Sequence, residues 1–168
     1  MNIRFAEAQD LDGIIALIAE RIAWMDEMGI EQWNRTGYLT RYPREYFLSL
    51  TERKELFVAE DNSGISGVMA LFSTDSRWSD DGVVPALYVH HLTAALRCRG
   101  LGRELLTWAE GYAAGEGKKR LRLDSAEGNA ALEHFYTTQG YTEAGFCTDG
   151  LYRGILREKN LDAEVESK

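Results

Sequence analysis

Residues 97–102 read Arg-Cys-Arg-Gly-Leu-Gly and have the types and the position that suit binding of an anion. They follow an apolar, strand-like run at residues 86–94 and precede a helical run that begins at Leu101. The first turn of a helix leaves about four N–H groups without partners and carries a partial positive charge. Gly100 and Gly102 lack the Cβ atoms that would keep a phosphate away from the backbone. The segment therefore predicts an anion site, with a plain turn flanked by solvated arginines as the alternative.

Spacing separates the phosphate-binding loops that this bend could form. A Walker-type loop needs Gly-x4-Gly-Lys-Ser/Thr, which occurs nowhere in the chain, so hydrolysis of ATP or GTP is disfavoured. A dinucleotide fingerprint needs Gly-x-Gly-x-x-Gly, but Leu105 occupies the third glycine position after Gly100 and Gly102. What is left is the pattern Arg97-x-x-Gly100-x-Gly102.

A second segment with chemical potential begins at Asn129, where we expect a helix. Tyr136 follows seven residues later, which returns to within about 20° of the same helix face and roughly 10 Å along the axis. One extended ligand can contact both side chains. Their ordinary structural interpretations are a helix cap for Asn129 and a core aromatic for Tyr136.

Together the two segments resemble the motifs of the GNAT (Gcn5-related N-acetyltransferase) superfamily. Residues 97–102 are similar to its Gln/Arg-x-x-Gly-x-Gly/Ala motif, and residues 129–141 to its Asn-x6-Tyr-x3-Gly-Phe/Tyr segment. Residues 24–33 resemble the Trp-x4-Gly-Ile-x-Gln-Trp pattern of a bacterial subgroup of undefined substrate. The resemblance implies an α/β (α+β) fold, with a mixed, mostly antiparallel sheet of about seven strands flanked by about four helices.

The resemblance also implies that acetyl-CoA is the acyl donor and that no metal takes part. Backbone N–H groups near the Gly bend would hold the pyrophosphate, Asn129 would contact the pantetheine region, and Tyr136 would lie near the thioester sulfur. The implied cofactor-binding residues are Leu92, Thr93, Ala94, Arg97, Cys98, Arg99, Gly100, Leu101, Gly102, Arg103 and Asn129.

The implied reaction is direct attack of a primary amine on the thioester in a ternary complex. A Tyr O–H, with a pKa near ~10, can protonate the leaving sulfur, so Tyr136 is the expected general acid. A backbone N–H near residues 91–93 would stabilise the oxyanion. Many relatives carry a Glu on the strand before the bend, but this strand has none, so His90 and His91 are the candidate bases. A hydrogen-bonded core role is the alternative for each histidine.

Substrate choice in such folds comes from the segment after the first helix and from the loop before the central strand. Trp24, Trp33 and Tyr38 are the candidate acceptor-binding residues, since aromatic rings beside carboxylates can hold a cation. The two tryptophans alternatively serve only to seal this segment onto the sheet. The expected acceptor is a primary amine of a small molecule or peptide. A non-catalytic acyl-CoA sensor, or an acetyltransferase of protein lysines or N-termini, is the alternative function.

The elements that must position these residues follow from periodicity. Strands are expected at residues 3–5, 56–60, 66–73, 83–94, 120–125, 141–146 and 151–156. Helices are expected after a cap at Asp10, from Pro43, from Leu101 to about Gly117, and from Asn129 to Gln139 with a stop at Gly140. The strands on either side of the long helix should be parallel, because a crossover helix joins them.

Length and charge limit the remaining possibilities. The 168 residues, 45% of them hydrophobic, predict one domain over residues 1–158 and a charged tail over 159–168. A net charge of −8 argues against a nucleic-acid partner. The lack of a long apolar stretch or signal argues against a membrane, and two cysteines without metal-ligand spacing fit the cytoplasm. A homodimer is expected from the resemblance.

Overall fold

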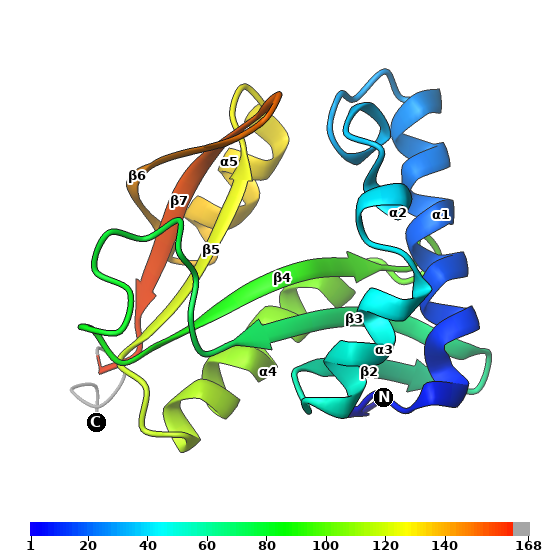
Figure 1. Cartoon of the computed structure of the whole chain (residues 1–168), viewed down its shortest axis with the longest axis horizontal. Helices are drawn as coiled ribbons and strands as arrows, with labels where there is room; N and C mark the ends of the chain where they lie inside the picture. The colour runs from blue at the N-terminus through cyan, green and yellow to red at the C-terminus, as the bar shows by residue number, and fades with distance from the viewer. Residues whose placement is uncertain (163–168) are drawn as a thin grey trace. The chain divides into compact units, whose positions relative to one another are not determined.

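The computed structural model describes residues 1–162 and contains seven strands and five α-helices over that range (Figure 1). Two short 3₁₀ helices, Ala8–Asp10 and Trp33–Arg35, precede and follow the first α-helix. The elements in chain order are β1 (Asn2–Phe5), α1 (Leu11–Glu27), α2 (Tyr38–Arg41), α3 (Arg44–Glu52), β2 (Leu56–Asp61), β3 (Gly64–Phe72), β4 (Ala86–Ala94), α4 (Leu101–Gly115), β5 (Arg120–Ala126), α5 (Ala130–Thr138), β6 (Thr142–Asp149) and β7 (Tyr152–Asn160).

The strands are ordered β1-β2-β3-β4-β5-β7-β6 in the sheet. β4 and β5 are parallel, whereas the pairs β1/β2, β2/β3, β5/β7 and β6/β7 are antiparallel. This confirms the expected mixed, mostly antiparallel sheet and the parallel strands on either side of α4. The five α-helices agree with the expected number of about four, and the segment after α1 contains the single-turn α2 as well as α3.

The described residues divide into two compact units. The first unit comprises Met1–Leu71 and His91–Leu105, and the second comprises Phe72–His90 and the chain from Leu106 onward. β4 and α4 each contribute residues to both units. One domain over residues 1–158 therefore stays a prediction.

The core of the first unit forms where apolar side chains of α1 and α3 meet. Leu11, Ile14 and Ile18 recur at helical spacing on α1 and are fully buried, as are Phe47 and Leu50 on α3. α1 begins at Leu11 as expected, but Asp10 does not cap it. The Asp10 carboxylate instead accepts hydrogen bonds from the Glu7 N–H (2.8 Å) and from Arg4 of β1 (2.7 Å). The Asp10 side chain therefore pairs with Arg4 and with the backbone at the start of the preceding 3₁₀ helix, and it does not cap α1.

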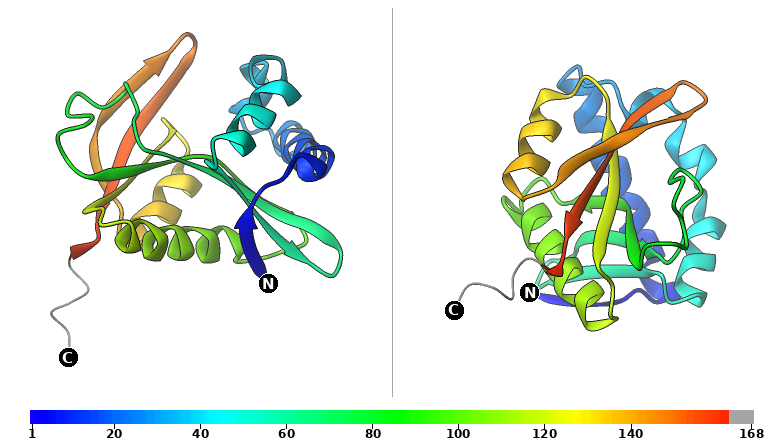
Figure 2. Two further views of the ribbon diagram at one scale, coloured as in Figure 1. Left: turned by 60° about the horizontal axis from the view of Figure 1, so that its bottom comes forward. Right: turned by 90° about the vertical axis from the view of Figure 1, so that its left-hand side faces the viewer.

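The second unit is built on β5, which pairs with β7 along its whole length, from Arg120 opposite Asn160 to Ala126 opposite Gly154 (Figure 2). This pairing extends β7 beyond the expected residue 156, through Asn160, into the segment expected to be a tail. Residues 163–168 of that tail lie outside the described residues. β4 begins later than expected, since Pro85 has no N–H to donate and Val83 is 78% exposed. Among residues 1–162, no helix is both long and apolar enough to cross a membrane.

Candidate active site

The Gly bend, residues 97–102, lies in the first unit and leads into α4. Gly100 has φ +84°, in the left-handed region that favours glycine. Its carbonyl accepts the N–H groups of Arg103 (3.0 Å) and Glu104 (3.2 Å), which closes the first turn of α4. Within residues 1–162, the N–H groups of Arg99, Gly100 and Gly102 donate to no backbone carbonyl. We call these three donors the cradle; backbone N–H groups without a backbone partner at a helix N-terminus are the kind of group that binds phosphate oxygens in other proteins.

Close packing against β3 holds the start of α4 in place. A Cβ atom at Gly67 would lie 2.9 Å from Cδ1 of Leu105 and 3.4 Å from Cδ2 of Leu101. A larger residue at position 67 would force the Leu105 side chain to shift, so glycine favours this close approach of the helix to the strand. Leu101 and Leu105 are both buried, so the cradle rests on a rigid support.

The Arg97 guanidinium is engaged by a carboxylate of the same unit. Its Nη2 lies 3.2 Å from Asp61 Oδ1, at the end of β2. Asp61 also accepts the Ser63 N–H at 2.7 Å, and this bond, followed by the charge of Arg97, lowers the pKa of Asp61. The Arg97 side chain is 45% exposed, and such an exposed pair is weak. An anion can therefore compete with Asp61 for Arg97.

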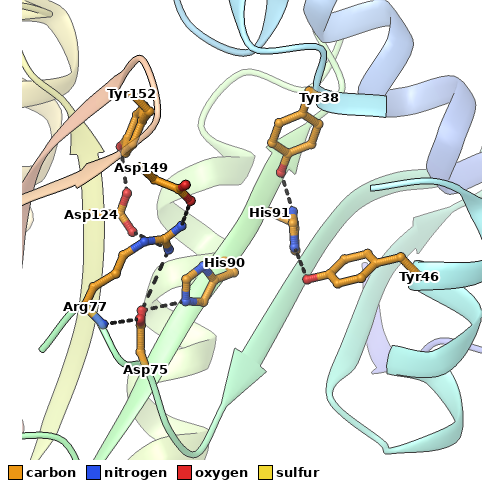
Figure 3. Close-up of polar contacts among 9 residues, drawn as sticks. All are labelled: Tyr38, Tyr46, Asp75, Arg77, His90, His91, Asp124, Asp149 and Tyr152. Atoms are coloured by element: carbon orange, nitrogen blue, oxygen red, sulfur yellow. Dashed lines mark hydrogen bonds and ion pairs between the residues drawn. The ribbon is translucent and has the colours of Figure 1, made fainter. Parts of the chain in front are cut away.

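His91 is buried among tyrosines of the first unit (Figure 3). The Tyr38 hydroxyl hydrogen-bonds its Nδ1, and the Tyr46 hydroxyl lies 2.8 Å from its Nε2. The Tyr42 ring packs edge-on against the imidazole at 4.8 Å. Since a neutral imidazole has one donor and one acceptor nitrogen, one tyrosine donates a proton and the other accepts one. The arrangement is a Tyr–His–Tyr chain that can pass a proton.

The three aromatic residues expected to bind the acceptor have different surroundings. Trp33 stacks on Tyr38 at 4.4 Å, and Tyr38 is 8% exposed, so these two rings belong to the cluster around His91. Trp24 instead has the Arg21 guanidinium over its ring at 5.0 Å. The structure thus brings Trp33 and Tyr38 together and gives Trp24 a separate cationic partner.

His90, the residue before His91 on β4, has its own network in the second unit (Figure 3). Its Nε2 lies 2.9 Å from Asp75 Oδ2, and the Phe72 ring stacks on the imidazole at 4.7 Å. Burial opposes ionisation of Asp75, but hydrogen bonds from His90 and from the Arg77 N–H outweigh it, so the pKa of Asp75 is lowered. Asp75 is therefore a carboxylate that orients His90. This pairing could not be predicted from the sequence, because His90 and Asp75 share no motif.

Three carboxylates lie near the Arg77 guanidinium, and one of them, Asp75 of the loop before β4, is 4.0 Å away. The guanidinium also lies 3.4 Å from Asp124 of β5 and 3.4 Å from Asp149 of β6, while the Tyr152 hydroxyl of β7 donates to Asp124 at 2.6 Å. Asp75, His90 and Asp124 each offer one atom that could bind a metal ion, and these three atoms all lie within 4.8 Å of one another. The guanidinium already supplies positive charge there, so these groups do not fit a metal centre well.

The second sequence segment lies in the second unit. Asn129 Oδ1 accepts the Leu132 N–H at 3.1 Å, which confirms the helix cap. Tyr136 is 8% exposed and packs against Tyr141, and its hydroxyl has no hydrogen-bond partner among residues 1–162. Burial, followed by the charge of Asp124, raises the pKa of Tyr136 well above its usual range, and Arg157 acts in the opposite direction.

This combination of fold and motifs matches a known protein family. Residues 18–141 match the model of the acetyltransferase (GNAT) family. The chain belongs to the GNAT family. This confirms the resemblance inferred from the Gly bend and the Asn129 segment and makes the protein an acetyltransferase of that family.

Relatives of this GNAT protein match along most of its length. It is 29% identical over 163 residues to the uncharacterised N-acetyltransferase YesJ of Bacillus subtilis, covering 93% of this chain and 88% of YesJ. A GNAT acetyltransferase structure from Listeria monocytogenes superposes with a TM-score of 0.77 at 24% identity, covering 95% and 94% of the two chains. The PaiA N-acetyltransferase of Thermoplasma acidophilum, solved with coenzyme A, gives a TM-score of 0.73 at 20% identity and coverage of 95% and 98%. The structural matches establish the GNAT fold.

Proposed function

We propose that this GNAT protein is an acetyl-CoA-dependent N-acetyltransferase that acts on a primary amine of a small molecule or peptide. The observation that carries the proposal is the cradle of three backbone N–H groups, from Arg99, Gly100 and Gly102, at the start of α4. Such a cradle matches the oxygens of a pyrophosphate. The coenzyme A bound to the PaiA enzyme supports the same donor here.

We propose that the donor is bound by the end of β4, the Gly bend and the start of α5. The end of β4 would run beside the pantetheine arm, and Arg97 would exchange Asp61 for a phosphate oxygen. Asn129 would both cap α5 and contact the donor. The full proposed set is Leu92, Thr93, Ala94, Arg97, Cys98, Arg99, Gly100, Leu101, Gly102, Arg103 and Asn129.

Tyr136 is the proposed general acid that protonates the leaving sulfur. Its hydroxyl has no partner among the described residues, which supports a role toward a ligand. The oxyanion would be stabilised by a backbone N–H near residues 91–93. The positive φ of His91, +56°, supports this, because it interrupts the regular strand geometry at that point.

His90 is the better candidate base of the two histidines. The Asp75 carboxylate beside it would fix its tautomer and stabilise the imidazolium that forms when it takes the amine proton. His91 has tyrosine hydroxyls at both ring nitrogens, so it would act as a relay between them.

The charge of the His90 network favours a cationic acceptor. Asp75, Asp124 and Asp149 place three carboxylates around the guanidinium of Arg77. Trp24, Trp33 and Tyr38 remain the proposed aromatic contacts of the acceptor. A cytoplasmic location and a homodimer also remain proposals, which cell fractionation and light scattering would test.

The test is release of CoA from acetyl-CoA in the presence of a panel of amines and peptides, paired with calorimetric titration of CoA. We expect turnover of at least one amine, a loss of about 100-fold or more in kcat for Tyr136→Phe, and unchanged CoA affinity. Tyr112→Phe makes the same change on α4, outside the proposed machinery, and should retain kcat.

The same experiment separates the alternatives. Full activity of Tyr136→Phe would contradict the general-acid role. Tight CoA binding without turnover of any acceptor would favour an acyl-CoA sensor. Turnover of peptides but of no small amine would favour a protein acetyltransferase.

A further inference from the structure

Arg157 of β7 is a buried cation with an unused hydrogen-bond donor. Arg157 is only 3% exposed, and its Nε donates a hydrogen bond to the Ser125 hydroxyl at 2.9 Å. Its Nη2 is fully buried and has no hydrogen-bond partner among residues 1–162. Burial of an unsatisfied charged donor is unfavourable, so such groups in folded proteins call for an explanation. A ligand atom that accepts from Nη2 would provide one.

Strand register places Arg157 on the face of the sheet next to α5. Arg157 lies opposite Leu123 of β5, and its side chain reaches Ser125, two residues along on the same face. Lys159 shares that face of β7, and its Cε would lie 3.4 Å from a Cβ atom added at Gly140, directly after α5. α5, which carries Tyr136, packs beside β5 (Figure 2).

Tyr136 and Arg157 each present an unpartnered polar group in this region. The Tyr136 hydroxyl and the Arg157 Nη2 do not bond each other or any other described residue. They are nevertheless close enough for the guanidinium to lower the pKa of Tyr136. One acceptor atom within hydrogen-bond distance of both groups would satisfy both.

We propose that Nη2 of Arg157 donates a hydrogen bond to the sulfur of coenzyme A and stabilises that sulfur as it leaves as a thiolate. This inference rests on the proposed acetyltransferase reaction and adds a residue that neither family motif includes. When the tetrahedral intermediate collapses, the C–S bond breaks and its electron pair goes to sulfur. The Tyr136 proton then moves to that sulfur, which leaves a thiol and a phenolate. The guanidinium stabilises the negative charge first on sulfur and then on the phenolate oxygen.

The experiment compares the affinity of CoA with that of desulfo-CoA, which lacks the sulfur, by calorimetry from pH 6.5 to 9.5. A free thiol titrates near ~8.5, so a site that prefers the thiolate binds CoA progressively better as the pH rises. For the wild type we expect the affinity ratio of CoA to desulfo-CoA to rise about tenfold across this range. Arg157→Met should abolish the rise, and Arg157→Lys, which retains a positive charge, should restore part of it.

Arg153→Met is the matched control, because Arg153 lies on the same strand with its side chain 72% exposed and paired with Glu127. It should show the wild-type rise. A structural defect would weaken the binding of CoA and of desulfo-CoA equally, and the pH dependence of their affinity ratio would stay unchanged. If Arg157→Met does not fold, as judged by circular dichroism, Ser125→Ala carries the test, since it removes the hydroxyl that orients the guanidinium. In Ser125→Ala, the increase of the affinity ratio between pH 6.5 and 9.5 should be at least threefold smaller than in the wild type.

The outcomes distinguish this inference from the proposed function. A wild-type ratio that does not change with pH, or an unchanged rise in Arg157→Met, overturns the role of Arg157 and leaves acetyl transfer standing. Failure of the wild type to bind either CoA or desulfo-CoA would overturn both.

Discussion

Nε2 of His90 lies 2.9 Å from Oδ2 of Asp75, which joins β4 to the loop that precedes it. Asp75 is held in turn by the Arg77 N–H at 3.0 Å. A carboxylate fixed in this way restrains the imidazole to one orientation, which a base requires at the moment of proton transfer. The neighbouring His91 has tyrosine partners instead, so two adjacent residues of one strand have different chemistry available to them.

Replacement of Asp75 tests the His90 base. We expect Asp75→Ala to lower kcat about 100-fold, because the imidazole loses both its orientation and a counter-charge, with little change in the KM for acetyl-CoA. Steady-state CoA release with an amine that the wild type accepts is the measurement. Asp80→Asn, in the same loop, removes an ion pair with Arg122 and should reduce stability while retaining kcat. Equal kcat for Asp75→Ala and wild type would eliminate the base assignment.

A Cβ atom at Gly100 should impair the cradle. Gly100→Ala places a side chain at φ +84° in open space, within the bend that we propose binds the phosphates. We expect at least tenfold weaker binding of CoA by calorimetry and a loss of about 1 kcal/mol of stability from the strain. Gly117→Ala imposes a similar strain at φ +72° in open space after α4. It should lose similar stability and retain CoA affinity.

The two cysteines should differ in reactivity. Burial, followed by the charge of Asp124, raises the pKa of Cys147 to about 11, so at pH 8 only about one molecule in 1,000 carries its thiolate. Cys98 lies in the Gly bend and is partly exposed. Iodoacetamide at pH 8 should therefore label Cys98 well before Cys147, as measured by peptide mass spectrometry. Bound CoA should slow labelling of Cys98; a rate unaffected by saturating CoA would place the donor elsewhere.

Asp10 should make stability depend on pH. The hydrogen bond from Arg4, opposed by burial, lowers the pKa of Asp10, so the native state favours its ionised form. The stabilisation is complete above the unfolded-state pKa near ~3.9 and disappears as pH falls through the lower folded-state value. Asp10→Asn should lose about 1–3 kcal/mol in urea unfolding at pH 7 and clearly less at pH 2.5.

Asp12→Asn is the control for Asp10, because the Asp12 carboxylate is 88% exposed and forms only a surface pair with Arg44. It should change stability by less than about 0.5 kcal/mol at either pH. An equal loss at pH 7 and pH 2.5 for Asp10→Asn would show that its charge is not responsible.

Features that depend on neighbours in the chain could be predicted from the sequence. The Asn129 cap is a bond to the N–H three residues later, and the bend before α4 needs a positive φ that Gly100 adopts readily. The parallel pairing of β4 and β5 followed from the helix between them. The Asp10 cap was wrong, although the local pattern favoured it, because a residue of another element, Arg4, binds the carboxylate.

The sequence by itself determined the family, the fold and the position of the Gly bend, since these follow from local hydrogen bonding, glycine conformations and helical or strand periodicity. Only the tertiary structure decided which side chains meet: Asp75 with His90, two tyrosines with His91, and Ser125 with Arg157. Those partners are 15 to 53 residues apart, and strand register and loop paths bring them together. No local pattern encodes such distances, because each partner's position depends on how the whole sheet pairs.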